Sequence, residues 1–438
     1  MIEAFLIKGG KPLKGEIKVA GSKNAATKMM VASLLTSEKV ILENFPRIGD
    51  TEITAELCRS VGSKVKIRDH RLEIQTPKIT NFRVKQLSQR NRIPILALGP
   101  LLNRIKKAEV PVLGGDKIGH RPIDFHIASL TKLGAKITIE GLVYKAKTKG
   151  LRGTSINLFY PSVGATENTL LAAVLAKGKT VISGAAIEPE IIDLIKFLQK
   201  MGAIIELGVD RKIYIEGVKR LNGVTHRIIP DRNEAVSFAV MALATKGKIL
   251  VKGAVQGHLI NFLNAVRRLG GNFKIFPEGI EFSRRNNRPF NPLVIETDTH
   301  PGFMTDWQQP FCILLTQARG LSVIHETVYE DRFGYTQDLN RMGAKIKTTT
   351  KCLGKLPCRF SKKGYNHNCQ IKGPTPLSGS RIVIPDIRAG IAHIIAALTA
   401  KGESLITGIA HIDRGYENLE GRLKKLGADI KRVEIDKN

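Results

Sequence analysis

The sequence predicts an α/β (α+β) protein with two domains, each built from three copies of a βαβαββ unit. Three observations predict this fold: a helix-ending glycine that recurs along the chain, a strand-like stretch after it, and a second, apolar helix ahead of most copies. The signal, an apolar residue followed by glycine, recurs at intervals of roughly seventy residues. Its glycines are Gly62, Gly134, Gly202, Gly270, Gly343 and Gly427.

Each of these glycines is interpreted as the end of an amphipathic helix. A glycine just past the last helical residue adopts the left-handed conformation without a Cβ penalty. A lysine or arginine lies in the last turn of most copies, as Lys132 and Arg341 do, where its charge complements the helix dipole. The residues that follow alternate between apolar and polar, as in 135–139, which predicts a strand.

A second helix is expected upstream of four of the signals. Each candidate opens with a capping-type residue and carries small and apolar side chains on most faces, so it must be buried. The predicted helices are Ser162–Ala176, Asp231–Thr245, His300–Thr316 and Asp386–Ala400, with Ser22–Leu35 as a related segment.

Units of this size cannot bury enough apolar surface alone, so they are expected to pack together, buried helices inside and sheets outside. We expect domain I to span residues 21–229, with a mobile loop at 112–122, and domain II to span 1–20 plus 230–438. A strand pair near the N-terminus, Ala4–Lys8 and Gly15–Ala20, is expected to complete the second domain.

The composition predicts a cytoplasmic protein without membrane association. Hydrophobic residues make up 42% of the chain, no apolar run reaches 18 residues, and the N-terminus lacks a signal pattern. The formal net charge of +30 admits three interpretations: charge spread over a solvated surface, an anionic small-molecule ligand, or nucleic acid. Because the charge is dispersed, aromatic residues are only 5% and no nucleic-acid motif occurs, the first two are favoured.

Five cysteines in 438 residues do not indicate a disulfide framework. Cys352, Cys358, His367 and Cys369 cluster in one polar stretch. Their spacing matches no standard zinc pattern, so an ordinary surface insertion is favoured over a metal site.

Places where the repeat is interrupted are candidate functional sites. In Gly21–Ala26, a Gly-Ser turn precedes a buried helix, with Lys23 and Asn24 in the first turn. A helix N-terminus attracts anions, whereas a lysine there is unfavourable on dipole grounds. A phosphate or carboxylate ligand is therefore favoured over a solvated lysine.

Further interruptions carry single carboxylates. Asp116 lies among three glycines of a stretch from Val112 to Asp124, which indicates a mobile loop able to close over a ligand, although such loops are common. Asp306 either caps the helix that follows it or has a functional role. An aspartate precedes an arginine at Asp231 and Asp413 and lies two residues before Arg388, and any one such pair is more typical of a structural ion pair.

Taken together and in this order, the segments resemble the UDP-N-acetylglucosamine enolpyruvyl transferase family over almost the whole chain. The resemblance implies the family's two-domain inside-out α/β barrel, three repeated units to each domain. The matching phrases are 21–26, 97–100, 118–122, 162–166, 188–190, 230–232, 305–306, 386–389 and 413–416.

The resemblance implies transfer of the enolpyruvyl group of phosphoenolpyruvate to the 3′-hydroxyl of UDP-N-acetylglucosamine, through a tetrahedral ketal and with release of phosphate. This is the first committed step of peptidoglycan synthesis, and no cofactor or metal is expected. Asp306 is the expected contact of the sugar hydroxyl, and Asp116 the expected proton donor to carbon 3. The expected phosphoenolpyruvate contacts are Lys23, Asn24, Arg121, Arg388 and Arg414.

For the nucleotide sugar, the resemblance implies contacts along two short segments and with the backbone of one residue. Asp124 is expected on the uracil, and the Val328 backbone on the sugar. The full expected set is Arg92, Arg121, Pro122, Ile123, Asp124, Phe125, Ser162, Val163, Gly164, Asp306 and Val328.

Two positions depart from the family pattern. Most members carry cysteine where this chain has Asp116, which removes the thiol that the epoxide antibiotic fosfomycin alkylates. To donate a proton near neutrality, Asp116 needs a pKa above the usual value of about 3.9. Tyr160 replaces a frequent lysine near the diphosphate, which puts that nucleotide contact in doubt.

Two other functions remain open from the sequence. One is a shikimate-pathway enolpyruvyl transferase of the same fold, against which the uridine-side residues around Asp124 argue. The other is a non-catalytic relative that binds nucleic acid, against which the retained Lys23, Asp306, Arg388 and Arg414 argue. The expected partners are the two small-molecule substrates, and the expected state is a monomer.

Overall fold

The computed structural model describes residues 1–438 apart from 85–86, 89–90, 113–122, 285–288, 357 and 437–438. The chain forms two compact units. One contains the described part of residues 20–229, and the other contains 1–19 and 230–438; they are called here the 20–229 unit and the 230–438 unit. Each has a separate hydrophobic core. No helix among the described residues is long and apolar enough to cross a membrane.

The βαβαββ repeat predicted from the glycine signals is clearest near the end of the 20–229 unit. Strand β9 (Ser155–Asn157) pairs in parallel with β10 (Lys179–Ser183), and helix α5 (Val163–Ala173) connects them. Helix α6 (Pro189–Lys200) then leads to a hairpin of β11 (Ile204–Leu207) and β12 (Ile213–Glu216), which joins the sheet antiparallel to β10. The sheet order is therefore β11-β12-β10-β9.

The other two sheets of this unit follow the same plan. In one, of order β13-β3-β5-β4, the first strand comes from the far end of the unit; in the other, β6-β8-β7, an isolated parallel bridge between Arg83 and Glu109 takes the place of the first strand. Their strands are β3 (Lys39–Glu43), β4 (Lys64–Arg68), β5 (Arg71–Gln75), β6 (Lys107–Pro111), β7 (Lys136–Glu140), β8 (Val143–Lys147) and β13 (Thr225–Arg227). Their helices are α1 (Lys23–Ala32), α2 (Gly49–Ser60), α3 (Leu98–Ile105) and α4 (Asp124–Lys132), with 3-10 turns η1 (Ser33–Leu35) and η2 (Ile93–Ala97).

The described residues of the 230–438 unit also form three sheets, here each with four strands, of order β15-β16-β14-β2, β17-β18-β20-β19 and β21-β22-β1-β23. Its strands are β1 (Ile2–Lys8), β2 (Lys14–Lys18), β14 (Lys248–Lys252), β15 (Gly271–Phe276), β16 (Gly279–Arg284), β17 (Val294–Glu296), β18 (Gly320–His325), β19 (Lys345–Thr349), β20 (Asn368–Gly373), β21 (Arg381–Val383), β22 (Glu403–Thr407) and β23 (Asp429–Ile435). Its helices are α7 (Arg232–Ala244), α8 (Ile260–Leu269), α9 (Gln308–Leu315), α10 (Thr336–Arg341), α11 (Ile387–Thr399), α12 (Ala410–Asp413) and α13 (Leu419–Lys425), with 3-10 turns η3 (Gln256–His258) and η4 (Thr305–Trp307).

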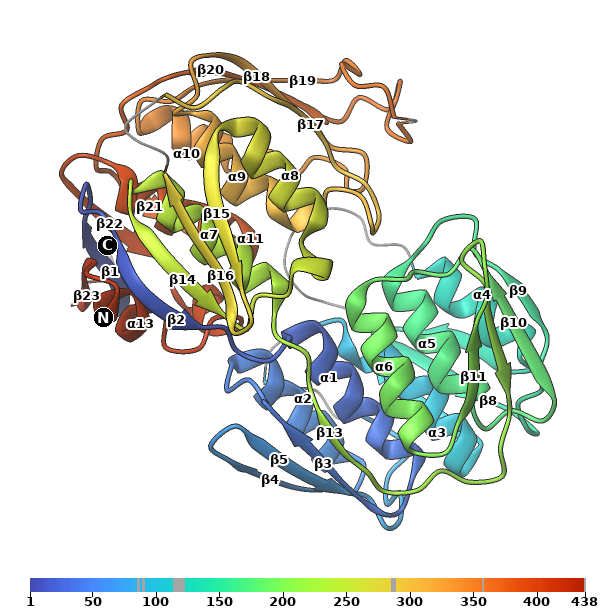
Figure 1. The fold of residues 1–438 in the computed structure, drawn as a ribbon. Helices are drawn as coiled ribbons and strands as arrows, with labels where there is room; N and C mark the ends of the chain where they lie inside the picture. Colours follow the sequence, from blue (N-terminus) through green and yellow to red (C-terminus); the bar gives the residue numbers. More distant parts are fainter. Residues whose placement is uncertain (85–86, 89–90, 113–122, 285–288, 357, 437–438) are drawn as a thin grey trace. The chain divides into compact units, whose positions relative to one another are not determined.

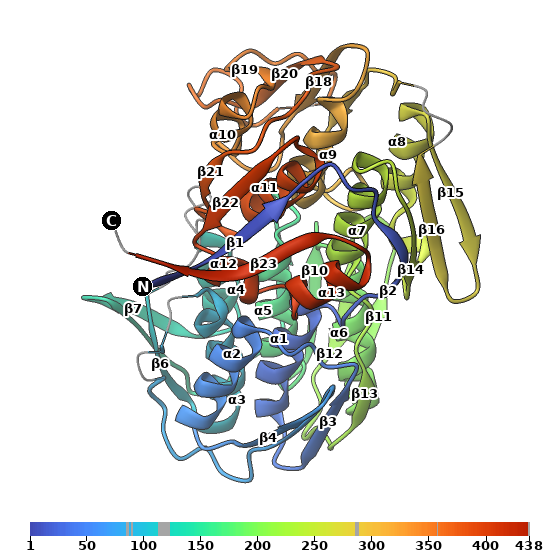
Figure 2. The same cartoon turned by 90° about the vertical axis from the view of Figure 1, so that its left-hand side faces the viewer.

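The N-terminal strands complete this unit, but they do not pair with each other. Strand β1 lies between β22 and β23 and is antiparallel to both, while β2 runs parallel to β14 in a different sheet. Figure 2 shows the blue N-terminal strand beside the red C-terminal ones. The unit is therefore built from both ends of the chain.

The helix predictions are confirmed with one exception in position. All six signal glycines have positive φ, between 91° and 111°, and lie one or two residues after the last residue of a helix. Helix α7 buries twelve of its thirteen residues, and α7, α9 and α11 pack against one another with sheets around them (Figure 1). The helix expected from His300 begins only at Gln308, after the 3-10 turn η4 that starts at Thr305, because Gly302 N–H donates to the Thr299 carbonyl in a turn that precedes them.

Candidate active site

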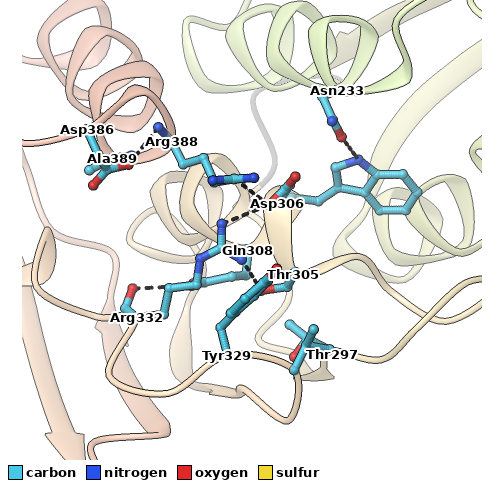
Figure 3. A network of polar contacts seen from close by, with 12 residues as sticks. Asn233, Thr297, Thr305, Asp306, Gln308, Tyr329, Arg332, Asp386, Arg388 and Ala389 are labelled. Atoms are coloured by element: carbon cyan, nitrogen blue, oxygen red, sulfur yellow. Dashed lines mark hydrogen bonds and ion pairs between the residues drawn. The ribbon is translucent and has the colours of Figure 1, made fainter. Parts of the chain in front are cut away.

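In the 230–438 unit, the Asp306 carboxylate lies between two guanidinium groups. Its Oδ1 is 2.7 Å from Arg332 Nη2 and 2.6 Å from Arg388 Nε (Figure 3). Asp306 comes from η4, at the entry to α9, but the N-cap of α9 is Trp307, which makes no side-chain cap. The alternative that Asp306 is simply a helix cap is therefore wrong.

The two arginines decide the protonation state of Asp306. Burial by itself would raise the pKa of this carboxyl group, but Arg388 and Arg332 outweigh that effect and hold the pKa well below its usual range. The same pairing raises the pKa of Arg388 against the effect of its own burial. Asp306 is therefore ionised at every physiological pH in this arrangement, with its charge neutralised by its neighbours.

Arg388 is directed towards Asp306 by the start of α11. Asp386 is the N-cap, and its Oδ1 accepts hydrogen bonds from the N–H groups of Arg388 (2.8 Å) and Ala389 (3.1 Å). Asp231 caps α7 in the same way. In both segments the aspartate carboxylate accepts hydrogen bonds from backbone N–H groups at the start of the helix. In the segment that begins α11, the side chain of Arg388 extends to Asp306.

Arg332 was not among the residues selected from the sequence. Its side chain is 2% exposed and bonds both Asp306 and the hydroxyl of Thr305, and its guanidinium lies 4.9 Å from the ring centroid of Tyr329. The sequence did contain a signal, because Asp331 precedes Arg332 just as Asp231 precedes Arg232.

Glu326, also missed, organises the chain next to this network. Its buried carboxylate accepts hydrogen bonds from the hydroxyls of Thr297 (2.9 Å) and Thr305 (2.8 Å). It also accepts from the backbone N–H groups of Val328 (2.9 Å) and Tyr329 (3.0 Å). The N–H of Val328 is therefore already used by Glu326.

The third aspartate of these pairs has an arginine partner in another element. Asp413, at the end of α12, pairs with Arg432 of β23, with Oδ1 and Nη2 3.0 Å apart. Arg414 is the C-cap residue of that helix.

In the 20–229 unit, Lys23 is the first residue of α1, where Ser22 caps the helix by accepting from Ala25 N–H at 3.4 Å. Its Nζ lies 3.1 Å from Asp50 Oδ2, and the Lys23 side chain is only 22% exposed. Lys23 is therefore a partly buried, paired cation, and the alternative of a fully solvated lysine is wrong. Asn24 follows it in the first turn of the same helix.

A second group in this unit surrounds the starts of α4 and α5. Burial, and then the nearby Arg92 charge, lower the pKa of His126 to about 3. A Cβ on Gly164 would lie 3.1 Å from His126 Cε1 and Nε2, so α5 approaches the imidazole closely. The predicted contacts Ile123, Asp124 and Phe125 lie at the start of α4, and Ser162 and Val163 at the start of α5.

Glu167 of α5 lies in an acidic, buried neighbourhood. Burial raises its pKa to about 7, Lys28 opposes this, and Glu190 and Glu188 add to it. The Lys28 Nζ is 3.9 Å from Glu167 Oε1. This side chain can therefore hold a proton near neutrality.

Comparison with known proteins gives the family. A family model described as "EPSP synthase (3-phosphoshikimate 1-carboxyvinyltransferase)" matches residues 7–423. The chain is 50% identical to a UDP-N-acetylglucosamine 1-carboxyvinyltransferase of Protochlamydia amoebophila, over 100% of this chain and 96% of the relative. It is 49% identical to the protein of that name from Chlamydia pneumoniae, over 97% and 94% of the two chains.

The chain belongs to the UDP-N-acetylglucosamine 1-carboxyvinyltransferase family. Solved structures support the fold of this enolpyruvyl transferase. The enolpyruvyl transferase NikO from Streptomyces tendae is 21% identical, with a TM-score of 0.86 over 99% of each chain. An EPSP synthase from Acinetobacter baumannii is 17% identical, with a TM-score of 0.70 over 99% of this chain and 100% of that one.

Some predicted site residues of this enolpyruvyl transferase cannot be placed. Asp116, Arg121 and Pro122 lie outside the described residues. The structure does bring Asp306 and Arg388 together in one unit, and it gathers Arg92 with the α4–α5 segments in the other.

Proposed function

We propose that this enolpyruvyl transferase moves the enolpyruvyl group of phosphoenolpyruvate to the 3′-hydroxyl of UDP-N-acetylglucosamine and releases phosphate. The observation that carries the proposal is the Asp306 carboxylate, ionised between Arg332 and Arg388. Identity near 50% with relatives of that name over the whole chain supports the same acceptor. The reaction is the first committed step of peptidoglycan synthesis.

The chemistry has two steps. In the addition, the sugar oxygen attacks carbon 2 of phosphoenolpyruvate while carbon 3 gains a proton, for which Asp116 is the proposed donor. In the elimination, the tetrahedral ketal loses phosphate from carbon 2 and a proton from carbon 3. Both substrates and the ketal are anionic, so Lys23, Arg121 and Arg414 are proposed to bind their charges.

The low pKa of Asp306 limits when this carboxylate can accept the proton of the sugar hydroxyl. A carboxylate paired with two arginines is a weak base, so it cannot remove the hydroxyl proton ahead of the attack. Proton transfer to Asp306 must accompany formation of the carbon–oxygen bond, when the hydroxyl becomes acidic. Arg388 contacts Oδ1 of Asp306 in this structure. We propose that its guanidinium group binds the carboxylate or phosphate of phosphoenolpyruvate when that substrate is present.

The nucleotide is proposed to bind along the α4–α5 segments. Asp124 and Phe125 open α4, and Ser162 to Gly164 open α5, whose N-terminal amides favour a diphosphate. Arg92 lies close enough to His126 to lower its pKa, which brings a cation to the same place. On the sugar, the proposed contact is the Val328 carbonyl.

Phosphate release from phosphoenolpyruvate tests the proposal. It should require UDP-N-acetylglucosamine and should not occur with shikimate 3-phosphate, the acceptor that the family model's description suggests. Asp306→Ala, Lys23→Ala and Asp116→Asn should each cripple turnover, whereas Asp436→Asn, at an exposed position near the C-terminus, should not. Phosphate release with shikimate 3-phosphate alone would refute the acceptor, and full activity of all three variants would refute the site.

A further inference from the structure

Four side chains of the 230–438 unit converge outside the site described above. The potential ligand atoms of His325, Cys352, Cys358 and His367 all lie within 4.8 Å of one another. His325 ends β18, and the other three belong to the segment between β19 and β20, which extends from the right-hand end of their sheet in Figure 1. The set has two sulfur and two nitrogen atoms, the ligand chemistry of a structural zinc site.

The orientation of His325 is the first argument for a ligand. Its ring is fully buried, and its Nδ1 lies 3.1 Å from Glu296 Oε2. Its Nε2 is buried and has no hydrogen-bond partner among the described residues. A histidine that donates from one ring nitrogen to a carboxylate presents the other for metal coordination, and such carboxylate–histidine pairs typically support metal ligands.

His367 repeats this arrangement from the other side of the cluster. Its Nδ1 lies 2.8 Å from the Tyr365 carbonyl, which favours a proton on that nitrogen. Its Nε2 lies 3.2 Å from Cys352 Sγ. Both imidazoles are buried, and both are oriented by a neighbouring oxygen acceptor so that Nε2 is available as a lone-pair donor.

The loop that carries the cysteines is fitted to these histidines. Glu296, besides contacting His325, accepts hydrogen bonds from the N–H groups of Lys355 (2.8 Å) and Leu356 (2.9 Å). A Cβ on Gly354 would lie 2.0 Å from Glu296 Oε2 and 2.2 Å from His325 Nδ1, so only glycine allows this approach. The carboxylate therefore orients a histidine and holds the chain between Cys352 and Cys358.

The grouping differs from the one that the sequence suggested. Cys369 is fully buried in β20 beside Cys312 and is not part of the cluster. The fourth member is instead His325, which lies 27 positions before Cys352. A sequence search for short ligand spacings could not find this set, because β18 and β20 are neighbours only in the folded sheet.

We propose that His325, Cys352, Cys358 and His367 bind one zinc ion in a tetrahedral, structural site. Binding converts the two thiols to thiolates and releases two protons, so affinity rises with pH over the range in which the thiols ionise. Four protein ligands leave no open position, which excludes a catalytic role for the ion itself.

The expected effect of the ion is to attach the 351–367 segment to the end of β18. The residue after His325 is Glu326, whose carboxylate holds Val328, Tyr329 and Thr305. Zinc would therefore fix the strand end from which the Asp306 network is built, and its loss should loosen that network without removing any group from it.

Zinc content of the purified full-length protein tests the proposal. After incubation with Zn²⁺ and removal of the excess, the wild type should hold one zinc per chain, and Co²⁺ in its place should give the absorption of a tetrahedral site with thiolate ligands. Cys352→Ser/Cys358→Ser and His325→Asn should abolish both signals. Cys369→Ala is the matched control and should retain both.

A positioning substitution separates a metal site from a merely structural cluster. Glu296→Gln should weaken zinc affinity by roughly 10- to 100-fold, measured by competition with a chromophoric chelator. Wild type that holds no more zinc than the double variant, or that contains a Cys352–Cys358 disulfide in its place, would overturn the proposal. Circular dichroism of each variant shows whether it folds, and if the double variant does not, the Co²⁺ spectrum of the wild type decides.

Discussion

The Nε of Arg388 lies 2.6 Å from Oδ1 of Asp306, and this contact joins the start of α11 to the turn η4 that leads into α9. Two residues 82 positions apart thus form an ion pair, and Arg332 makes a second ion pair with the same oxygen of Asp306. The two arginines together explain why this carboxylate, only 12% exposed, stays ionised.

Replacing Arg388 by alanine should impair turnover and stability together. Loss of one cation leaves a buried carboxylate with only Arg332, so we expect destabilisation of up to about 3 kcal/mol. If Arg388 also binds phosphoenolpyruvate, kcat should fall by about 100-fold or more. Urea unfolding and phosphate release measure the two effects. Arg381→Ala, at an exposed position of β21, is the control; equal loss in both variants would contradict the assignment.

The Asp306 network should contribute stability that acid removes. The pKa of Asp306 is depressed in the folded protein, so its contribution is complete above the unfolded pKa of about 3.9 and declines as pH falls towards the folded value. The difference in unfolding free energy between wild type and Asp306→Asn should be constant from about pH 8 to pH 5 and shrink below about pH 4. A difference that already shrinks at neutral pH would show that Asp306 titrates there.

His126 should make stability depend on pH in a higher range. Its pKa falls from 6.5 to about 3 on folding, so the unfolded chain binds the extra proton first and stability declines as pH drops from 6.5 towards 3. The loss is on the order of a few kcal/mol. His126→Gln should flatten this slope, and His258→Gln should not. An imidazole resonance of His126 that titrates near 6.5 would refute the buried, neutral state.

Arg92 should be responsible for part of that shift. Its charge is the second cause of the lowered pKa of His126, after burial. Arg92→Gln should therefore raise the pKa of His126, and it should also raise KM for the nucleotide sugar if Arg92 contacts the diphosphate. NMR titration and steady-state kinetics test the two parts separately. An unchanged KM with a shifted pKa would remove Arg92 from the proposed substrate site.

Asp116 should make the enzyme insensitive to fosfomycin. A carboxylate in the place of the usual thiol lacks the sulfur nucleophile that the epoxide alkylates. Incubation with fosfomycin should leave activity unchanged, and intact mass should show no adduct. Asp116→Cys is the matched variant and should become sensitive; time-dependent inactivation of the wild type would refute this prediction.

Much of the fold could be predicted because it rests on local rules. The glycines after α2 and α6 end helices through a left-handed conformation, and the capping residues Asp231 and Asp386 begin helices, wherever the rest of the chain lies. Helix α3 was not predicted, because it is short, follows the 3-10 turn η2 and has Pro100 in its first turn. The start of α9 was placed too early because apolar composition does not reveal a turn before a helix.

The candidate site was less accessible from the sequence. Asp306 and Arg388 were noted at interruptions of the repeat and given roles through resemblance to a family, and their contact could be seen only in the folded unit. Arg332 and Glu326 were missed because a buried charge is unremarkable in sequence until its partners are known. The proposed metal-ligand set was missed because His325 belongs to a different strand from the segment that carries the two cysteines.

By itself, the sequence determined the repeat and the ends of most helices, because helix capping, glycine conformation and hydrophobic periodicity act over a few neighbouring residues. It also indicated the family, through short phrases that resemble those of its members in the same order. Tertiary structure alone decided which carboxylate lies between which arginines, that β1 inserts between β22 and β23, and that His325 joins Cys352, Cys358 and His367. Ion pairs, strand order and ligand geometry depend on distances in space, and residues far apart in the chain acquire those distances only when it folds.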